Sequence, residues 1–586
     1  MPPLFMAIPA YSSDRSSGSS SKVVKRIRVR PQEPKIAEQI SAELGTNEVV
    51  SRILAARGFV PGEELKNYLN PTLRNGLPDP LTLKNLKEAT QVIISCHQQG
   101  KSIAICCDFD VDGLSGGSVV HDFFNAVGIS SKVFVPDRFV DGYGLHERVV
   151  RDIAAGGFGL LLTIDFGTTN VKEISVAKEL GLTTVVVDHH HISDAPPPAD
   201  VFINPHQKGC GFAKGTASAA GLAWYLVLGL AREFKSSGVD AKNYLELACL
   251  GTICDMVPLV GVNRVIAKRG LEALSESKRP GLRALRNVIG VRGNVGCSDV
   301  SFGIGPRLNA AGRIVHGELV VELLTTRDSI RAEKLARDLN ELNAERQVIE
   351  SAVKEAAIAQ IESRGGPSWG LVAWHEEFHT GVIGIVAQRL VEHYYRPAAV
   401  MGMDSQGIWK GSVRGIKGFS VVEALASVKE HLLKFGGHDG AGGFSVTAEK
   451  LEVFREAFDA ECKKRLEKIE IVPYVDADTE ATLEECTVQL VRDLANLAPF
   501  GMGNPTPIVL VSDLIVKEVR VLKDAHLKVL LSDGRRFISG LMWRQTSHPA
   551  LVVGKRVRIA CKPDINTFQG SLELQATLQA VEEMAG

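Results

Sequence analysis

The sequence lacks the features that mark secreted, disulfide-stabilised or membrane proteins. Its ten cysteines include no C-x-x-C pair, and the adjacent Cys106 and Cys107 suit neither a zinc knuckle nor a regular disulfide framework. No apolar run approaches the roughly 20 residues that span a bilayer. The initial MPPLFMAIPAYSS has no basic region of the kind that opens a secretory signal. We therefore expect a cytoplasmic protein without a membrane span.

An excess of charge is also absent. Lysine and arginine total 67 against 68 aspartate and glutamate, so composition alone does not indicate a nucleic-acid binder, and any basic surface must be local. Residues 1–44 are expected to be a flexible basic segment, because YSSDRSSGSSS cannot drive burial and KVVKRIRVR carries five basic residues in nine positions. A solvated tail is favoured over a nucleic-acid arm, since short charge runs often have no specific partner.

The chain is long enough for three or four domains at about 150 residues each. From about residue 101, short apolar runs alternate with helical stretches, as in SIAICCD, KVFVPD, LLLTID and TVVVDHH. This alternation predicts an α/β domain with a mostly parallel sheet over residues 45–325. Each of the four runs ends in an acidic residue, at the strand end where such sheets bind ligands.

Residues 326–365 are predicted to form a long connecting helix. Apolar residues recur at steps of three and four, with Arg346 as the one interruption, and Gly365-Gly366-Pro367 ends the pattern. A helix of this length would span about 50 Å and so join two lobes. A coiled-coil dimer is the alternative, which the interrupting arginine disfavours, and we expect a monomer.

Two further domains are predicted after this helix. Residues 366–470 read as a smaller α/β domain, from GLVAWHEE through the glycine-rich GGHDGAGG. Residues 471–586 contain five short strands, which predict a β-barrel of the OB-fold kind. Its lysines and arginines, with Phe537, Trp543 and Phe568, could bind a single strand, although each aromatic could equally belong to the core.

The segment CCDFDVDG places Asp108, Asp110 and Asp112 directly after an apolar strand. If the segment stays extended, the three carboxylates point to one side, where their repulsion calls for a divalent cation. The alternative is that these aspartates cap a helix beginning near Ser115.

Further acidic and histidine residues favour the metal interpretation. Asp165 ends LLLTID, His189 and His190 follow TVVVD, and Asp255 lies in LGTICDMVPL. Imidazole together with carboxylate suits manganese, or magnesium with lower affinity. Two ions about 3.5–4 Å apart would provide the chemistry of phosphodiester hydrolysis.

These motifs resemble those of the DHH phosphoesterases, in the order DxDxDG, IDFG, DHH and GTICDMVPL. The later PRLNAAGR, GVIGIVAQR, GSVRG and GGHDGAGG resemble the connector and DHHA1 domain of the RecJ type, and LAPFGMGNPTP resembles its junction to an OB-fold. The resemblance covers about residues 45–586.

The resemblance implies two divalent cations, Mn²⁺ or Mg²⁺, with Asp165 bridging them and His190 facing the scissile phosphate. The implied metal ligands are Asp108, Asp110, Asp112, Asp165, His189 and Asp255. Many DHH proteins have a histidine where this chain has Cys106. The sequence leaves open whether Asp108 or Cys106 completes the first metal site, with a core role favoured for the cysteine.

Phosphate contacts are expected from guanidinium and polar groups in the same motifs. The candidates are Arg138, Arg307, Asn309, Arg313, Ser412, Arg414 and His438. The resemblance assigns Ser412 and Arg414 to the 5′ terminal phosphate, with Arg138 beside them, and His438 to the strand near the metals.

The implied function is a single-stranded-DNA-specific 5′ to 3′ exonuclease that releases 5′-mononucleotides in recombination and repair. Implied partners are single-stranded DNA with a 5′ end, a single-strand-binding protein and a RecQ-type helicase. One rival is a DHH hydrolase acting on pyrophosphate, cyclic dinucleotides or short oligonucleotides, which the OB-like domain disfavours. The other is an inactive scaffold, which the retained carboxylates disfavour. The sequence leaves the physiological metal and the choice between DNA and RNA open.

Overall fold

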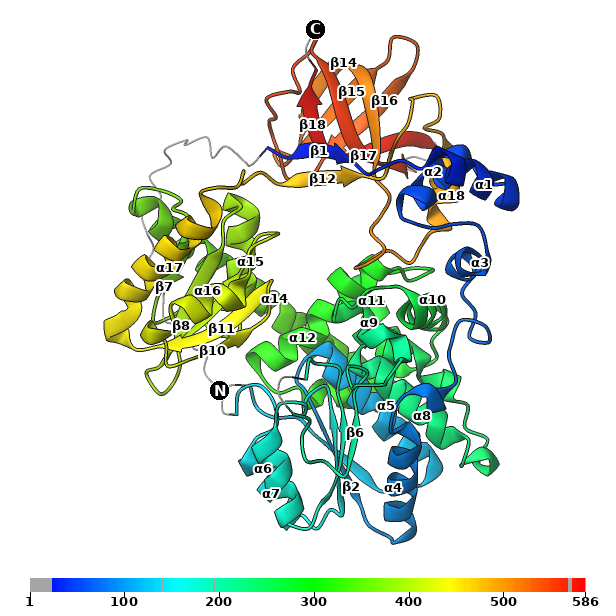
Figure 1. The fold of residues 1–586 in the computed structure, drawn as a ribbon, viewed down its shortest axis with the longest axis vertical. Coiled ribbons are helices and arrows are strands. Elements are labelled where there is room, and N and C mark those ends of the chain that lie inside the picture. The colour runs from blue at the N-terminus through cyan, green and yellow to red at the C-terminus, as the bar shows by residue number, and fades with distance from the viewer. Residues whose placement is uncertain (1–23, 139–140, 193–194, 567–571, 585–586) are drawn as a thin grey trace.

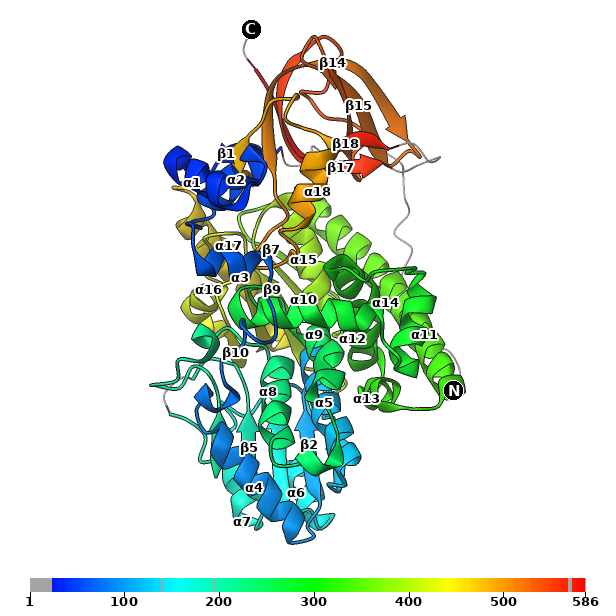
Figure 2. The ribbon, with the colours of Figure 1, turned by 90° about the vertical axis from the view of Figure 1, so that its right-hand side faces the viewer.

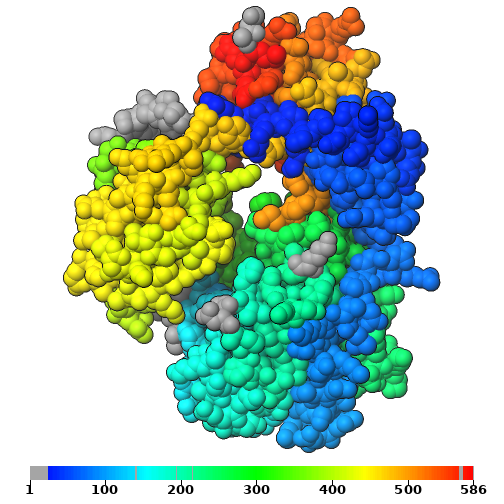
Figure 3. All heavy atoms as spheres, viewed as in Figure 1, coloured from blue at the N-terminus to red at the C-terminus, as the bar shows by residue number. Residues whose placement is uncertain are grey.

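The computed structural model describes residues 24–138, 141–192, 195–566 and 572–584. Four parts surround a central opening, which the space-filling view shows in the middle of the molecule (Figure 3). A domain with a parallel sheet lies at the bottom of Figure 1, a smaller α/β domain on the left and a barrel at the top. Helices from the start of the chain run down the remaining side.

The parallel sheet confirms the predicted α/β domain. Its strand order is β3-β2-β4-β5-β6, and every pairing is parallel. The strands are β2 (Ile103–Cys107), β3 (Ser131–Phe134), β4 (Leu160–Ile164), β5 (Thr183–Val187) and β6 (Val201–Ile203). The helices are α4 (Leu86–Gln98), α5 (Val111–Val127), α6 (Glu147–Ala155), α7 (Val171–Glu179), α8 (Ala219–Ala231), α9 (Leu245–Cys254), α10 (Gly261–Ser275), α11 (Pro280–Ile289), α12 (Gly305–Ile314) and α13 (Glu318–Thr325).

Helices cover both faces of this sheet, which explains why its strands are apolar on both sides. Side chains alternate between the faces of a strand, so along β2 Ile105 and Cys107 join the core on the α5 and α8 side, whereas Ala104 and Cys106 join the α6 and α7 side. Cys106 is fully buried there, which confirms the core role favoured from the sequence.

The predicted connecting helix is α14 (Ser329–Ser363), a single run of 35 residues. Leu335 and Leu339 belong to the core of the parallel-sheet domain, whereas Val353 and Ile361 belong to the core of the smaller α/β domain. The apolar seam is therefore divided between two lobes of one chain, as the connecting interpretation requires.

The smaller α/β domain has a mixed sheet of order β10-β11-β9-β8-β7, in which only β7 and β8 are parallel neighbours. Its elements are β7 (Leu371–Trp374), α15 (Ile383–Tyr394), β8 (Ala398–Met403), β9 (Trp409–Arg414), α16 (Val421–Ser427), β10 (Lys434–Gly437), β11 (Ala441–Val446) and α17 (Leu451–Leu466).

The predicted barrel is also present. Strand β14 pairs with both β15 and β17, and this double pairing closes the sheet β14-β15-β16-β18-β17. The elements from the junction onward are β12 (Tyr474–Ala477), β13 (Thr479–Glu480), α18 (Val488–Ala495), β14 (Val509–Leu522), β15 (His526–Ser532), β16 (Phe537–Met542), β17 (Arg556–Asn566) and β18 (Glu573–Glu583).

The start of the chain differs from the expectation of a flexible segment over 1–44. Residues 1–23 lie outside the described residues, but β1 (Arg26–Val29) pairs in parallel with β12. The basic run is ordered because its arginines meet acids of the junction: Arg26 pairs with Glu470 and Arg28 with Asp476. Three of the basic side chains that could have served a nucleic-acid arm, Arg26, Arg28 and Arg30, thus have acidic partners within the chain.

Three helices then lead from the barrel to the sheet domain: α1 (Pro34–Leu44), α2 (Glu48–Ala56) and α3 (Glu63–Leu69). Figure 2 shows them running down one side of the molecule. Ile53, Leu65 and Tyr68 share a core with the barrel, although the expected boundary placed residues 45–69 with the parallel sheet. No described helix is long and apolar enough to cross a membrane.

Candidate metal centre

The first aspartate motif lies where β2 passes into α5. Asp110 is the N-cap of this helix, and its side chain accepts hydrogen bonds from the backbone N–H groups of Asp112 (2.9 Å) and Gly113 (3.2 Å). The premise of an extended segment was therefore wrong, and the capping alternative holds for Asp110, although the helix begins at Val111 rather than near Ser115. The three carboxylates therefore divide: Asp108 and Asp110 share one possible ligand set, and Asp112 belongs to another.

Asp112 points inward, towards the N-terminus of α8. Its two carboxylate oxygens accept the backbone N–H groups of Ala219 (2.7 Å) and Ala220 (2.9 Å). Gly251 on α9 makes room for it, since a Cβ atom there would lie 2.3 Å from Asp112 Oδ1. Burial and the neighbouring charge of Asp110 nevertheless raise the pKa of Asp112 to about 7.

The other motifs converge on this point from β4, β5 and α9. His189 Nε2 lies 3.2 Å from Asp165 Oδ1, 3.7 Å from Asp255 Oδ2 and 3.9 Å from Asp112 Oδ2. Asp165 has a φ of 70°, so its backbone is left-handed as the chain leaves β4. The aspartates and histidines expected from the four motifs thus lie in one cluster.

Three sets of side chains within this cluster could each hold a metal ion. Their ligand atoms lie within 4.8 Å of one another in each set. The sets are Asp108, Asp110 and Asp165; Asp112, His189 and Asp255; and Asp165, His189 and His190. Asp165 and His189 each belong to two sets, so the sets share side chains as paired ions would require.

The unpaired atoms of the cluster fit divalent cations. Asp108 Oδ1 and His189 Nε2 are buried and have no hydrogen-bond partner among the described residues, which is costly unless a ligand satisfies them. Burial, with repulsion from its histidine neighbours, lowers the pKa of His189 to about 4, which leaves the neutral imidazole that metals bind. Burial and mutual repulsion raise the pKa values of Asp108 and Asp165, and bring that of Asp255 to about 9.

His190 is held differently from His189. Its Nδ1 lies 2.7 Å from Asp188 Oδ1, and its Nε2 lies 3.2 Å from the hydroxyl of Tyr143. Burial opposes the charge on both partners, but their hydrogen bond and attraction prevail, so the pKa of Asp188 is lowered and that of His190 is raised. Asp188 belongs to the DHH motif, but the sequence gave no signal that Asp188 and Tyr143 position His190.

Two cations lie near the cluster. Arg138, in the loop after β3, is attracted by Asp108 and Asp110, and Arg414 of the smaller α/β domain lies close enough to Arg138 for their charges to repel. Arg414 donates to Ser412 Oγ (2.9 Å), and both approach Gly384, where a Cβ atom would lie 3.0 Å from Arg414 Nη2. Gly384 is in the first turn of α15, and helix N-termini attract anions. Arg138 lies over the ring of Phe109, 5.0 Å from its centroid. The sequence gave no signal that the N-terminus of α15 lies beside Ser412 and Arg414.

The remaining candidates are more scattered. Asn309 accepts the backbone N–H of Val111 (3.2 Å) and so holds the start of α5. Arg307 points towards α14, where it donates to Asn340 Oδ1 (3.0 Å), and to Gly303 O (2.8 Å). His438 is exposed in the turn between β10 and β11. The structure therefore does not bring Arg307 to the acidic cluster.

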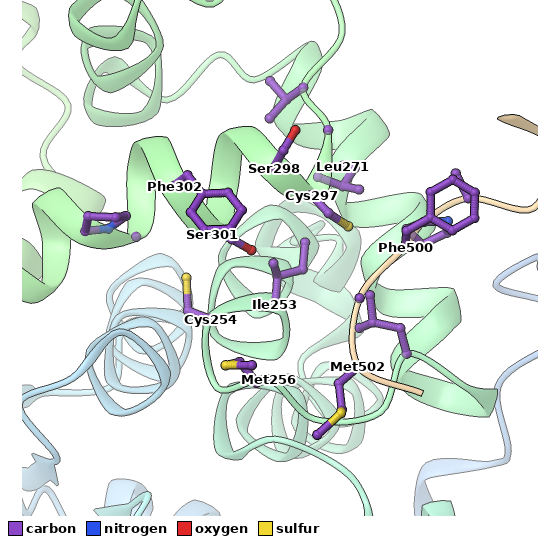
Figure 4. Close-up of a pocket in the computed structure, with 18 of the residues that line it drawn as sticks. Ile253, Cys254, Met256, Leu271, Cys297, Ser298, Ser301, Phe302, Phe500 and Met502 are labelled. Carbon is purple, nitrogen blue, oxygen red and sulfur yellow. The ribbon is translucent and has the colours of Figure 1, made fainter. Parts of the chain in front are cut away.

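A cavity of about 1150 Å³ adjoins the cluster. Asn309 and Arg313 line it, as does Met256, which follows Asp255. Figure 4 shows Phe302 and Ser301 facing Cys254 and Ile253 across the cavity, with Phe500 and Met502 on the loop along one side. Phe302 is 82% exposed and Met256 66% exposed, so this wall presents unusually large apolar surfaces to solvent.

Three family models match separate parts of the chain. The model of the DHH family N-terminal domain matches residues 102–252, that of the DHHA1 domain matches 368–464, and that of the RecJ OB domain matches 477–580. The single-stranded-DNA-specific exonuclease RecJ of Escherichia coli K12 is 30% identical over 586 residues, which cover 95% of this chain and 99% of that protein. The chain belongs to the RecJ family.

Comparisons with other RecJ proteins support the same assignment. RecJ of Bacillus subtilis, also named a single-stranded-DNA-specific exonuclease, is 33% identical over 94% of this chain and 70% of its own length. The crystal structure of RecJ from Thermus thermophilus in complex with Mn²⁺ matches with a TM-score of 0.83 at 30% identity, over 96% of this chain and 80% of that one. A structure of the Thermus protein with Mg²⁺ matches with a TM-score of 0.77. The Thermus structures contain Mn²⁺ and Mg²⁺, the two ions expected for the acidic cluster of this chain.

Proposed function

We propose that this chain is a metal-dependent exonuclease that degrades single-stranded DNA from its 5′ end and releases 5′-mononucleotides. The observation that carries the proposal is the cluster of Asp165, His189 and their neighbours, in which three sets of possible ligands share side chains. The names of the RecJ relatives supply the substrate class. On the family resemblance alone we also propose a role in recombination and DNA repair.

The expected ligands divide between two ions. Asp108 and Asp110 would hold one, Asp112, His189 and Asp255 the other, and Asp165 would contact both. When bound, such a pair supplies an activated water and stabilises the charge that develops on the phosphate. Asp188 holds Nδ1 of His190, so that Nε2, which lies 3.2 Å from the Tyr143 hydroxyl, would donate a hydrogen bond to the scissile phosphate when a strand is bound.

The polarity of the reaction follows from where a strand end could be held. Ser412, Arg414 and the N-terminus of α15 form an anion-binding corner, which we assign to the 5′ phosphate, with Arg138 beside it. A terminal phosphate fixed there would present the first phosphodiester to the acidic cluster, which accounts for release of mononucleotides. The cavity lined by Met256 and Phe302 gives the remainder of the strand a path.

The same cavity supports single-strand specificity, because unpaired bases can stack against its apolar and aromatic side chains. The barrel would hold the strand beyond the cavity. On the family resemblance alone we also propose that the chain acts as a cytoplasmic monomer with a single-strand-binding protein and a RecQ-type helicase.

The test compares substrates of different length. With manganese, the wild-type protein should degrade a long 5′-phosphorylated DNA strand faster than dinucleotides, because only the long strand reaches the cavity and the barrel. Release of mononucleotides from both is measured at equal concentration of 5′ ends. Strong preference for dinucleotides would instead favour a hydrolase of short oligonucleotides.

A further inference from the structure

Asn204 is a buried polar residue directly after β6, and the proposed chemistry does not use it. It is 0% exposed, which is unusual for asparagine. Its Nδ2 donates two hydrogen bonds, to the carbonyl oxygen of His190 (2.9 Å) and to Thr168 Oγ1 (2.9 Å). Its Oδ1 accepts the backbone N–H of His206 (2.8 Å). One side chain thus joins the segments that follow three neighbouring strands, β4, β5 and β6.

The bonds made by Asn204 complete a closed ring of hydrogen bonds that includes His190. The backbone N–H of Thr168 donates to Asp188 Oδ2 (2.9 Å), and Asp188 Oδ1 lies 2.7 Å from Nδ1 of His190. The ring closes where the His190 carbonyl accepts from Asn204. Thr168 and Asp188 are both buried. A buried polar network of this kind fixes one arrangement when every member is satisfied, and it loses that property when one member is removed.

The two sides of the ring hold different parts of His190. Asp188 holds Nδ1 of the imidazole and the backbone N–H of His190 (3.2 Å). Asn204 holds the carbonyl at the other end of the same residue. The chain needs this second hold, because the His190 side chain is 45% exposed and the next residue, His191, is exposed. Through Thr168, three residues after Asp165, Asn204 also ties this backbone to the loop that carries the expected bridging ligand.

We propose that Asn204 is a positioning residue, which fixes the backbone of His190 so that its Nε2 meets the scissile phosphate beside the acidic cluster. The inference rests on the proposed function and adds to it a residue that acts through another side chain. A displacement of about 1 Å in a catalytic group can cost about a hundredfold in rate. A hydrogen bond that prevents such a displacement therefore contributes to the rate without touching the strand.

The first test is kinetic. Asn204→Ala should lower the single-turnover rate of strand cleavage with manganese by about 10- to 100-fold, the range typical of residues that orient a group in the site. Binding of the strand with EDTA present should stay close to the wild-type value, because the arginines proposed to bind phosphate are untouched. A wild-type cleavage rate in Asn204→Ala would overturn the inference.

A double-mutant cycle shows whether Asn204 acts through His190. His190→Ala alone should slow cleavage, and the addition of Asn204→Ala should then slow it by less than about twofold, because residues of one network do not act independently. Excess enzyme and long incubation make these slow rates measurable. A second loss of full size in the double variant would mean that Asn204 acts elsewhere, and would contradict the positioning role.

Thr168→Val keeps the inference testable if Asn204→Ala does not fold. It removes the oxygen that anchors Asn204 but keeps the backbone N–H that binds Asp188, so it should slow cleavage by a smaller factor. Thr184→Val is the matched control. Thr184 is 0% exposed near the start of β5, away from the acidic cluster, and its hydroxyl donates to Asp200 Oδ2 (2.9 Å). This control should cleave at the wild-type rate, and an equal loss in both valine variants would indicate a general effect on the sheet and remove the inference.

Hydrogen exchange gives a readout that does not depend on activity. In the metal-free protein, the amides of residues 188–192 should exchange about tenfold faster in Asn204→Ala, the effect of losing one hydrogen bond from a local structure. Those of β2 should exchange as in the wild type. Unchanged exchange of residues 188–192 would overturn the positioning role alone. Failure of the wild-type protein to degrade single strands with manganese would overturn the proposed function and the inference with it.

Discussion

Asp165 is the side chain on which both expected ion sites depend. It belongs to two of the three possible ligand sets, and its oxygen lies 3.2 Å from His189. Its φ of 70° places it in a conformation that asparagine also tolerates, whereas branched residues do not. Asparagine at this position would therefore change the charge with little change in the backbone.

We expect Asp165→Asn to lower the rate of strand cleavage by a factor on the order of 10³, as for the loss of a group that stabilises charge in the transition state. Strand binding should stay within a few-fold of the wild type, because the arginines proposed to bind phosphate are untouched. The two quantities are measured by nucleotide release with manganese and by fluorescence anisotropy with EDTA. Near-normal cleavage would remove Asp165 from the metal centre.

Motif spacing was enough to predict which acids and histidines gather, because most of them follow strands of one parallel sheet and such strand ends meet at one edge. It could not predict their directions. Asp110 caps α5 rather than continuing a strand, and Asp112 turns towards the N-terminus of α8, which lies over a hundred residues later in the chain. Arg307 lies on the same helix as Arg313 but points to α14.

At the scale of elements, α10 anchors the loop that forms one side of the cavity. Arg264 on this helix is 2% exposed, and it donates to the carbonyl oxygens of Tyr68, Leu497, Ala498 and Pro499. Its guanidinium also lies over the Tyr68 ring, 3.9 Å from the centroid. One side chain thus joins the sheet domain to α3 and to the loop before the barrel.

Arg264→Met should destabilise the folded protein by about 3 kcal/mol, because several buried carbonyl groups lose their donor. Arg269→Met is the matched control on the same helix. Arg269 donates to one backbone carbonyl, that of Pro71, and is partly exposed, so its loss should cost about 1 kcal/mol or less. Thermal and urea unfolding of both variants measures the difference, and equal stability would contradict the anchoring role.

The elements themselves were predictable where their periodicity was strong. The strands of the parallel sheet, the barrel and α14 are where the apolar patterns placed them. The ordered structure of residues 24–44 could not be predicted, because it depends on partners more than 400 residues away, such as Glu470 for Arg26. A local charge pattern cannot show a long-range ion pair.

At the scale of the whole molecule, the unneutralised acids couple stability to pH and to metal. The raised pKa values of Asp112 (about 7) and Asp255 (about 9) mean that the folded protein binds more protons than the unfolded chain above the ordinary value of 3.8. Metal-free stability should therefore fall as pH rises towards 9. His189, with its pKa lowered to about 4, acts in the opposite sense between pH 4 and 6.5.

The loss of stability caused by these carboxylates should be clearest between pH 6.5 and 9, because His189 acts in the opposite sense only below pH 6.5. We expect the Tm of the EDTA-treated protein to fall across this range, and the increase in Tm on adding manganese to grow, because metal and protons compete for the same carboxylates. Asp165→Asn should show a smaller fall, since it removes one repelling charge. Differential scanning fluorimetry across this range measures all three, and a manganese effect independent of pH would argue against binding at these acids.

In the proposed function, the acidic cluster cleaves single-stranded DNA from its 5′ end while the cavity holds the rest of the strand. The most direct measurement is degradation of DNA labelled at either end, with and without manganese, as a single strand and as a blunt duplex. The account predicts that the single strand alone is degraded, that manganese is required, and that a 5′ label appears in mononucleotides before any 3′ label does. Early release of the 3′ label, or equal degradation of the duplex, would contradict it.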